Sequence, residues 1–494
     1  MSQQVRISVK EIRLDGNTIF SDVELKELIE VYENREITSG ELESLRQALT
    51  LLYVNRGYIN SGAVIPDQKV TDGVIHIRIV EGVLNDINIK GRQRLKSAYF
   101  TERIALGSAP PLNVNTLSQA LQFLQQNPRI DQLHAALVPG TAPGEAILDI
   151  QVREARPYHL RLGADNARAP SVGGEQGYLQ GLHRNLTGLG DTLNFKAAVT
   201  DGLEEFDISY ALPVTPKDTD LKLWYVRNNS KVVEDPFDEL DIEADEISYG
   251  IGLQHPVYRT LNQNVSLGVS LERRKSETQL LGEPFSFSPG AENGEVKLTI
   301  MRFTQEWLDR YRRRVLAVRS TFSFGLDALG ATVNGNDGDG KFVSWLGQFQ
   351  WAQRLGERNQ VILRADAQFA NDALPSLEQF AAGGLHTVRG YRENRQVTDQ
   401  GFIASLEFRF PVWTSKDGRN SIQIAPFYDY AAVRNRSRPT PGPRNFSSPG
   451  VGILGDFANR VHAGLYYGHA LQDFDDPDDD IQDDGFHFTV TLDF

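Results

Sequence analysis

The amino-acid sequence predicts two small α+β modules followed by an all-β transmembrane antiparallel barrel of about 16 strands. Three observations predict this fold class. Helical periodicity is confined to residues 5–156, and alternation of apolar and polar residues fills residues 157–494. No run of about 18 apolar residues is present that could cross a membrane as a helix. The 494 residues also exceed one ordinary core, so more than one domain is expected.

Residues 5–82 predict a first module with the order β-α-α-β-β. The run "VRISVKEIRLDGN" alternates as one strand, and Ser21 is a suitable N-cap for the helix that follows. A second helix is expected from near Ser39 to Gly57, because glycine favours the left-handed conformation that ends helices. The runs "GAVIPDQ" and "GVIHIRIVEG" predict the two closing strands.

Residues 83–156 repeat this plan. Strands are expected over "LNDINIKG", "IDQLHAALVPG" and "GEAILDIQVRE", and helices over "SAYFTERIAL" and "VNTLSQALQFLQQN". Each module is small, so its core alone is marginal. On pattern alone, two generic α+β modules with no special role are an alternative interpretation.

The remaining residues, 157–494, alternate in short runs up to the last residue. In "FHFTVTLDF" the apolar side chains share one face of a strand and the polar side chains share the other. Alternation over this length favours a closed barrel with its apolar face toward lipid, because open sheet edges cannot exist in hydrocarbon. Strands are expected to begin near residues 158, 174, 190, 204, 219, 243, 262, 294, 313, 341, 359, 399, 419, 447, 460 and 485.

Long polar segments interrupt the alternation at 228–242, 274–293, 328–340, 371–398, 434–446 and 470–484. An even number of strands places both barrel ends on one side, and such barrels have short periplasmic turns and long outer loops. All of these segments then fall on the outer side. Cys is absent, which suits a protein that crosses an oxidising compartment unfolded. The N-terminus has no apolar signal segment, so an exported chain is expected to have lost its signal already.

The loop 371–398 differs from the others in its composition. It carries apolar side chains, among them Leu385, Val388 and Tyr391, which need cover from water. Loops of this length without structure are usually functional or disordered. The lumen of a wide barrel is the available cover, since an unoccupied lumen would be an open aqueous channel. We therefore expect this loop to re-enter the barrel.

The tip of the loop reads "GGLHTVRGYRENRQ". Gly383 and Gly384 are expected to form the hinge of the re-entry, and Gly390 to permit close approach to the wall. Arg389 then lies in a confined space, where a guanidinium needs a carboxylate partner. In "IQIAPFYDYAAV", Asp429 lies on the face expected to be luminal. An exposed loop arginine and a solvated luminal carboxylate are the alternative interpretation of this pair.

Two groups of motifs resemble a known superfamily. "RGY…S…VIP" and "DGVIHIRIVEG" resemble POTRA modules, the periplasmic polypeptide-transport-associated repeats. "GGLHTVRGY" at 383–391 and "FYDYA" at 427–431 resemble the signature segments of outer-membrane transporters that join POTRA modules to a 16-strand barrel. In that superfamily, the residues that match Arg389 and Asp429 form a salt bridge that anchors the loop tip, Val388 to Tyr391, inside the barrel.

With two modules, the chain resembles the two-partner secretion transporters of the haemolysin-activator and filamentous-haemagglutinin type. The segment "NLTGLGDTLNF" at 185–195 also resembles an early barrel segment of this family. The match covers almost the whole chain. Members of this family often carry a helix before the first module that plugs the pore. This sequence starts directly at the first module, so we expect that helix to be absent, either cut away or never present.

The resemblance implies an outer-membrane pore with its POTRA modules in the periplasm. An unfolded partner exoprotein with an N-terminal secretion domain would add as a strand to a module edge, thread the barrel and fold outside. Outer-membrane lipid and lipopolysaccharide would surround the barrel. The terminal Phe494 resembles the signal that the bacterial barrel-assembly machinery recognises.

Two other functions are open at this point. A barrel-assembly insertase of the same superfamily would have outer-membrane proteins as clients, although such factors usually carry more modules. A passive porin or receptor would conduct steadily and would not need residues 5–156.

Several further classes of function are not expected. No Ser/His/Asp spacing, metal cluster or phosphate-binding loop indicates an enzyme or a cofactor, and His183, His255, His386 and His487 are interpreted as luminal or loop residues. The net charge of −14 argues against nucleic-acid binding. The acidic run 473–484 is either a solvated surface loop or a divalent-cation site near lipopolysaccharide phosphates. No metal ligands are assigned.

Overall fold

The chain divides into two compact units, which are Met1–Arg156 with Thr187–Gly190, and Pro157–Leu186 with Asp191–Phe494. The structure is a computed structural model that describes residues 6–474 and 480–494. Among these residues no helix has both the length and the apolar character needed to span a membrane.

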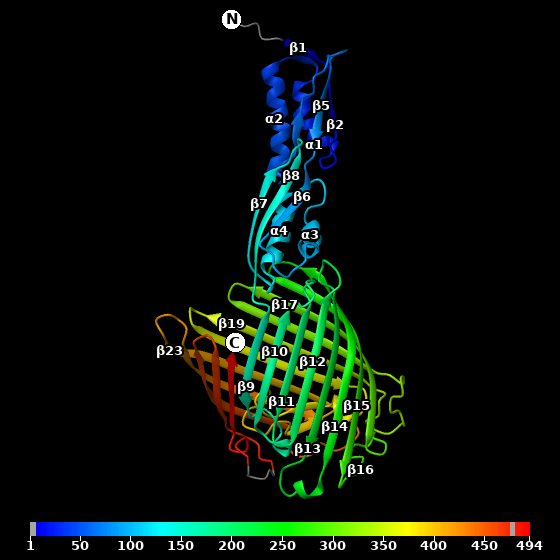
Figure 1. Cartoon of the computed structure of the whole chain (residues 1–494), viewed down its shortest axis with the longest axis vertical. Helices are drawn as coiled ribbons and strands as arrows, with labels where there is room; N and C mark the ends of the chain where they lie inside the picture. The colour runs from blue at the N-terminus through cyan, green and yellow to red at the C-terminus, as the bar shows by residue number, and fades with distance from the viewer. Residues whose placement is uncertain (1–5, 475–479) are drawn as a thin grey trace. The chain divides into compact units, whose positions relative to one another are not determined.

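The first unit begins with a module of mixed α/β structure (Figure 1). Its elements are β1 (Arg6–Val9), β2 (Glu11–Asp15), α1 (Asp22–Ile29), η1 (Glu30–Tyr32), β3 (Arg35–Thr38), α2 (Ser39–Asn55), β4 (Gly62–Val64) and β5 (Val74–Val80). The main sheet has the order β2-β5-β4, with β2 parallel to β5 and β4 antiparallel to it.

The single strand predicted at the start of this module was wrong. The backbone N–H groups of Lys10 and Glu11 both donate to the carbonyl oxygen of Gly73, at 2.8 and 3.3 Å, and divide the run into β1 and β2. β1 leaves the main sheet and pairs with β3, which the sequence pattern did not predict.

Both helices of this module begin at capping boxes. Ser21 caps α1, as predicted, and accepts from the backbone N–H of Glu24. Thr38 caps α2 and accepts from the backbone N–H of Glu41. The backbone N–H of Thr38 and the guanidinium of Arg35 lower the pKa of the Glu41 carboxyl to about 2. Gly57, with φ of +92°, follows the end of α2 in the left-handed conformation.

The second module repeats the same sheet arrangement. Its elements are β6 (Val83–Lys90), α3 (Ser97–Ala105), α4 (Val114–Gln125), β7 (Ile130–Pro139) and β8 (Glu145–Glu154). The order is β6-β8-β7, with β6 parallel to β8 and β7 antiparallel to it. Both the strands and the helices expected here are present. Each module therefore has a sheet with two open edges and a separate core.

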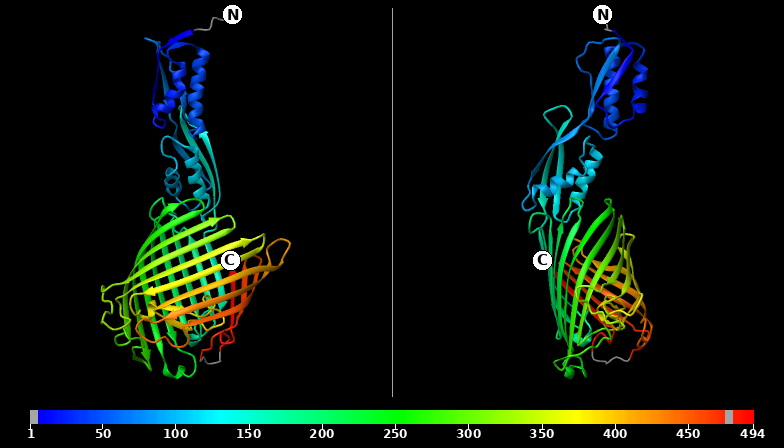
Figure 2. Two further views of the ribbon diagram at one scale, coloured as in Figure 1. Left: turned by 180° about the vertical axis from the view of Figure 1, so that it is seen from behind. Right: turned by 90° about the vertical axis from the view of Figure 1, so that its right-hand side faces the viewer.

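The second unit is a closed antiparallel barrel. Within the described residues its wall has seven strands (β9–β15), four strands (β17–β20) and five strands (β23–β27), sixteen in all, as predicted. Their bounds are β9 (Tyr158–Asp165), β10 (Gln176–Arg184), β11 (Thr192–Val199), β12 (Leu203–Pro213), β13 (Asp220–Lys231), β14 (Glu243–Arg259), β15 (Gln263–Leu280), β17 (Glu295–Tyr311), β18 (Arg314–Gly325), β19 (Val343–Leu355), β20 (Asn359–Ala370), β23 (Gln400–Thr414), β24 (Ser421–Arg434), β25 (Asn445–Phe457), β26 (Val461–Gly468) and β27 (Phe486–Asp493). Figure 2 shows the wall made by the yellow and orange strands.

The long polar segments of the sequence all join strands at one end of the barrel, as expected. Some of these segments are shorter than predicted because the strands extend into them. β15 continues to Leu280, although the polar segment was expected from residue 274. Charged side chains on this extension pair with neighbouring residues, as Lys275 does with Glu295 at 3.2 Å, so polarity there does not end the strand. The short strand β16 (Glu283–Pro284) pairs with the end of β15.

The barrel closes between its first and last strands. Figure 1 shows the red β27 beside β9. Thr489 to Asp493 pair with Asp165 to Arg161, and the Arg161 guanidinium donates to the Asp493 carboxylate at 2.7 and 3.0 Å. Phe494 extends this seam, because its backbone N–H donates to the carbonyl oxygen of Leu160 at 2.9 Å. The side chain of Phe494 is exposed.

The core of the first module offers a matched pair of leucines on α2. Leu45 is fully buried, whereas Leu51 is 46% exposed. We expect Leu45→Ala to lower the free energy of unfolding of a soluble fragment, residues 6–156, by about 2–5 kcal/mol, and Leu51→Ala by less than about 1 kcal/mol. Urea unfolding followed by far-UV circular dichroism measures both values. Equal losses for the two variants would contradict the core described here.

Candidate functional site

The connection between β20 and β23 contains structure of its own. A short helix, η4 (Ser376–Glu378), precedes β21 (Phe380–Ala382), and β22 (Gln396–Thr398) follows the tip. β21 and β22 pair antiparallel, from Phe380 with Thr398 to Ala382 with Gln396. The pattern of the sequence did not indicate this hairpin. It forms a neck that separates the segment 371–379 from the tip 383–395.

The tip packs against the inner face of the barrel wall. On β24, Tyr428 and Ile424 are exposed on the outside, while Phe427 and Asp429 are buried on the opposite face. Alternate residues of a strand face opposite sides of the sheet, so Asp429 points into the lumen. The tip residue Val388 is fully buried in a cluster that includes wall residues on the same inner face.

Arg389 forms the centre of the tip contacts. Its Nε and Nη2 atoms donate to the two Asp429 carboxylate oxygens at 2.8 and 2.9 Å, and its backbone N–H donates to Asp429 Oδ2 at 3.0 Å. Nη1 donates to Glu407, and Nη2 also donates to Ser405 Oγ at 3.2 Å. The guanidinium stacks 3.6 Å from the ring centre of Phe427. The Arg389 side chain is 5% exposed and Asp429 0%, so this is a desolvated bidentate pair.

The glycines of the tip adopt conformations that other residues rarely adopt. Gly383, Gly384 and Gly390 have φ of +113°, +103° and +91°. A Cβ atom on Gly390 would lie 2.7 Å from Ser448 Oγ and from the backbone of Gly468. Gly383 and Gly384 thus turn the chain beyond β21, and Gly390 brings the backbone against the wall.

Tyr391 closes the tip on its other side. Its hydroxyl donates to the carbonyl oxygen of Ser447 at 3.0 Å and accepts from the backbone N–H of Gln472 at 3.1 Å. Its ring packs edge-on against Phe446 and Phe474. Together with Arg389, these contacts attach the tip to β23, β24 and β25.

Sequence reasoning missed three residues of this site. Glu407, Phe427 and His487 all touch the tip, and His487 Nε2 accepts from the backbone N–H of Gly390 at 3.1 Å. The sequence pattern interprets His487 as a luminal or loop residue and does not indicate this contact. The alternation of β23 and β27 could have placed Glu407 and His487 on the inner face, but only the register of the folded barrel brings them to the tip.

Arg392, which follows Tyr391 in the tip, is held by acidic residues of two outer connections. Its guanidinium pairs with Glu234, between β13 and β14, and with Asp483, between β26 and β27. Asp483 belongs to the acidic run 473–484, of which residues 475–479 lie outside the described residues. In the described parts of the chain, no group of three or more His, Cys, Asp or Glu side chains could hold a metal ion.

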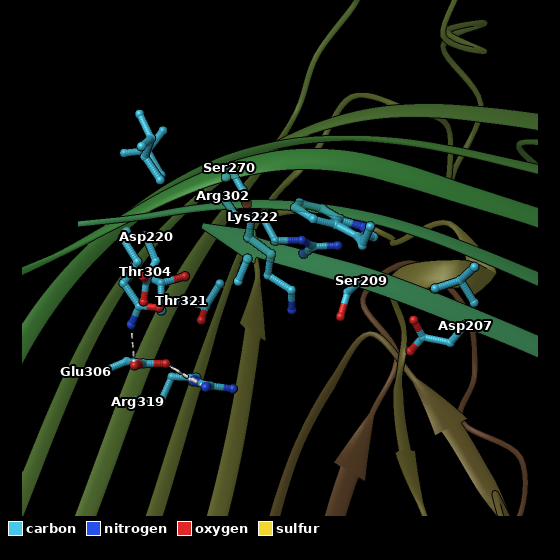
Figure 3. Close-up of a pocket in the computed structure, with 18 residues that line it drawn as sticks. Asp207, Ser209, Asp220, Lys222, Ser270, Arg302, Thr304, Glu306, Arg319 and Thr321 are labelled. Atoms are coloured by element: carbon cyan, nitrogen blue, oxygen red, sulfur yellow. Dashed lines mark hydrogen bonds and ion pairs between the residues drawn. The ribbon is translucent and has the colours of Figure 1, made fainter. Parts of the chain in front are cut away.

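A cavity of about 480 Å³ with a mixed polar and apolar lining lies on the inner face of β12 to β18 (Figure 3). Side chains of both charges line it, including Asp207, Lys222, Glu306 and Arg319, together with Ser, Thr and Gly residues and one aromatic side chain, Trp224. Glu306 pairs with Arg319, as the dashed line in Figure 3 marks. This part of the lumen thus presents charges of both signs and hydroxyl groups to its interior.

The comparisons with known proteins identify the family. The model of the haemolysin secretion/activation proteins ShlB/FhaC/HecB matches residues 144–454. The chain belongs to this family. The ShlB-type POTRA domain matches residues 7–82.

Several known proteins are similar to this chain at low sequence identity. The outer membrane transporter CdiB of Dickeya dadantii (strain 3937) is 21% identical over 417 residues, which are 82% of this chain and 73% of that protein. The heme/hemopexin transporter protein HuxB of Haemophilus influenzae (strain 86-028NP) is 22% identical over 449 residues, 87% of this chain and 76% of that protein. The solved structure of CdiB from Escherichia coli has a TM-score of 0.72 at 19% identity and covers 100% of this chain and 91% of that one.

These findings assign the chain to the outer-membrane transporters of two-partner secretion, with its POTRA domain in the periplasm. The family is one of transport pores and not of enzymes.

Arg389→Lys tests whether the fork of the guanidinium is required at the tip. Lysine keeps the charge but cannot donate to both Asp429 oxygens in one plane, so we expect the tip to open more often. Because the chain has no Cys, a Val388→Cys background reports opening through its reaction with a membrane-impermeant maleimide. The labelling rate should rise at least about tenfold. The matched control is Arg434→Lys, an exposed position at the end of β24. The requirement for a fork is refuted if both variants label like the parent.

Proposed function

We propose that this chain translocates an unfolded partner exoprotein from the periplasm to the cell surface. In this proposal the POTRA modules capture the N-terminal secretion domain of the client, the barrel lumen is the path, and the tip Val388–Tyr391 stays anchored inside the barrel. The observation that carries the proposal is the buried pair of Arg389 and Asp429, which holds a loop in the lumen of a barrel from a secretion family.

The loop anchor gives the barrel a defined resting state. A lumen of sixteen strands without contents would leak solutes across the outer membrane. Removing one partner of a buried ion pair leaves the other charge unpaired and costs about 3–5 kcal/mol. Asp429 is fully buried, so the cost of leaving its charge unpaired opposes release of the tip. The anchor thus closes the pore when no client is present.

The sheet edges of the modules suit an extended client. β7 is the longest edge strand of the two three-stranded sheets, with 10 residues, and among the residues that the structure describes it pairs only with β8. An edge strand offers backbone N–H and C=O groups to an incoming strand. We propose that the client adds to β7 before it enters the barrel.

The remaining partners follow from the outer surface of the barrel. Outer-membrane lipid and lipopolysaccharide would contact the apolar face. The barrel-assembly machinery would read the last strand, β27, together with Phe494, which follows it. Client folding at the cell surface would supply the driving force. The cavity on β12 to β18 offers the client hydrogen-bonding groups and charges of both signs.

Secretion of a cognate exoprotein tests the loop anchor. We expect Arg389→Ala and Asp429→Ala each to lower secretion about tenfold and to raise the conductance of the purified protein in planar bilayers, because the tip leaves the wall. Asp417→Ala, in the exposed turn between β23 and β24, is the matched control. Normal secretion and normal conductance in both variants would contradict the anchoring role of the Arg389–Asp429 pair.

Depletion of the chain separates secretion from barrel assembly. Loss of a single exoprotein supports secretion, whereas a broad loss of outer-membrane barrels supports an insertase. A passive porin would instead conduct steadily in bilayers and would need no residues before the barrel.

A charge on the β7 edge tests client capture. Ala136 is exposed on this strand, and a lysine there would oppose strand addition. We expect Ala136→Lys to weaken binding of the client's N-terminal secretion domain to the full-length protein at least about tenfold, as measured by biolayer interferometry. Gln119→Lys, on the exposed face of α4, should bind like the parent. Equal affinity of the two variants would place the client elsewhere.

A further inference from the structure

The re-entrant loop makes a second ionic contact, on a different part of the barrel wall from Arg389. Glu378, at the end of η4, is 6% exposed in its side chain. One of its oxygens accepts from Arg274 Nη1 and from Arg302 Nη2, both at 2.8 Å, and the other accepts from Arg302 Nη1 at 2.9 Å. Arg274 lies on β15 and Arg302 on β17. Arg274 Nη1 also donates to the carbonyl oxygen of Leu377 at 2.7 Å.

The two arginines do not depend on Glu378 for a partner. Arg274 also pairs with Glu246 on β14, and Arg302 pairs with Glu272 on β15 at 3.2 Å. If Glu378 left, each arginine would keep a carboxylate from the wall. The wall would not carry an uncompensated buried charge, which is the main cost of breaking a buried pair.

The tip differs in this respect. Asp429 is fully buried, and the ionic partner in contact with it is Arg389. Glu407 keeps Arg409, at 2.7 Å, if Arg389 leaves, but no second cation pairs with Asp429 among the described residues. Release of the tip therefore strands a carboxylate in the wall, and release of Glu378 does not.

We infer that Glu378 is a releasable anchor, and that the segment 371–379 leaves Arg274 and Arg302 during transport while the tip stays on Asp429. The β21–β22 neck makes this separation possible, because it lies between the two anchors. Leu374 packs in its own apolar cluster with Val296, Leu298 and Ile300, separate from the cluster of the tip. Arg302 also lines the cavity of Figure 3, so its contact with Glu378 borders that part of the lumen. Glu378 is a positioning residue in this proposal, which rests on the proposed secretion function.

Two cysteine reporters test the inference on the full-length protein in outer-membrane vesicles. Leu374→Cys reports the segment 371–379 and Val388→Cys reports the tip, since both side chains are nearly inaccessible and the chain has no other Cys. We expect Glu378→Gln to raise maleimide labelling of Leu374→Cys about tenfold and to leave labelling of Val388→Cys unchanged. Arg389→Ala should raise labelling of Val388→Cys. Glu283→Gln, at an exposed glutamate of β16, is the matched control.

The outcomes separate the inference from its alternatives. Unchanged labelling of Leu374→Cys in Glu378→Gln, or an equal rise at both reporters, overturns it. If Glu378→Gln fails to accumulate, Arg274→Gln replaces it, because this variant weakens the same contact while Arg302 stays on Glu378. Unchanged labelling of Leu374→Cys, or an equal rise at both reporters, then overturns the inference in the same way. The labelling experiment needs no client, so it tests the inference separately from the secretion function. If the secretion function were wrong and the inference right, Glu378→Gln would still raise labelling of Leu374→Cys alone, although no exoprotein is exported.

Discussion

The buried guanidinium of Arg389 imposes the constraint on which the lumen is organised. Arginine remains charged in proteins, so its removal from water requires carboxylates at fixed positions. The β23–β24 register supplies them, because Ser405 lies opposite Asp429 and Glu407 opposite Phe427. One strand pair thus presents two carboxylates, a hydroxyl and an aromatic face to a single side chain. The position of the loop tip and the register of β23 and β24 are therefore linked through Arg389.

A barrel in lipid can place such charges only on its inner face. The outer face must be apolar, while the inner face is free to carry ion pairs that link strand to strand, such as Arg302 with Glu272. These pairs explain why several strands continue where the sequence becomes polar. They also give a loop that folds inward a choice of ionic contacts. The wall therefore positions the loop as well as enclosing it.

Much of the fold follows from the sequence, because alternation over residues 157–494 leaves few architectures open. Alternation along β24 could assign Asp429 to the lumen, because every second side chain of a strand faces the same side of the sheet. Alternation along β23 and β27 could likewise place Glu407 and His487 on the inner face, but their contact with the tip depends on which strands become neighbours across the barrel. The division of the first strand at Lys10 depends on a hydrogen-bond acceptor, the carbonyl oxygen of Gly73, that is distant in sequence. Local pattern cannot contain such information.

The two ionic contacts of the loop differ in how the wall behaves when they break. At Asp429 the wall keeps a fully buried carboxylate whose partner has left, so the free energy of the open state is high. When Glu378 leaves, Arg274 and Arg302 keep their ion pairs with Glu246 and Glu272 of the wall. The open state of this segment therefore loses hydrogen bonds but leaves no unpaired charge in the wall. A loop with one contact of each kind has two segments whose movements differ in free-energy cost. The segment before β21 moves at lower cost than the tip, and a chain passing through the lumen would displace that segment first.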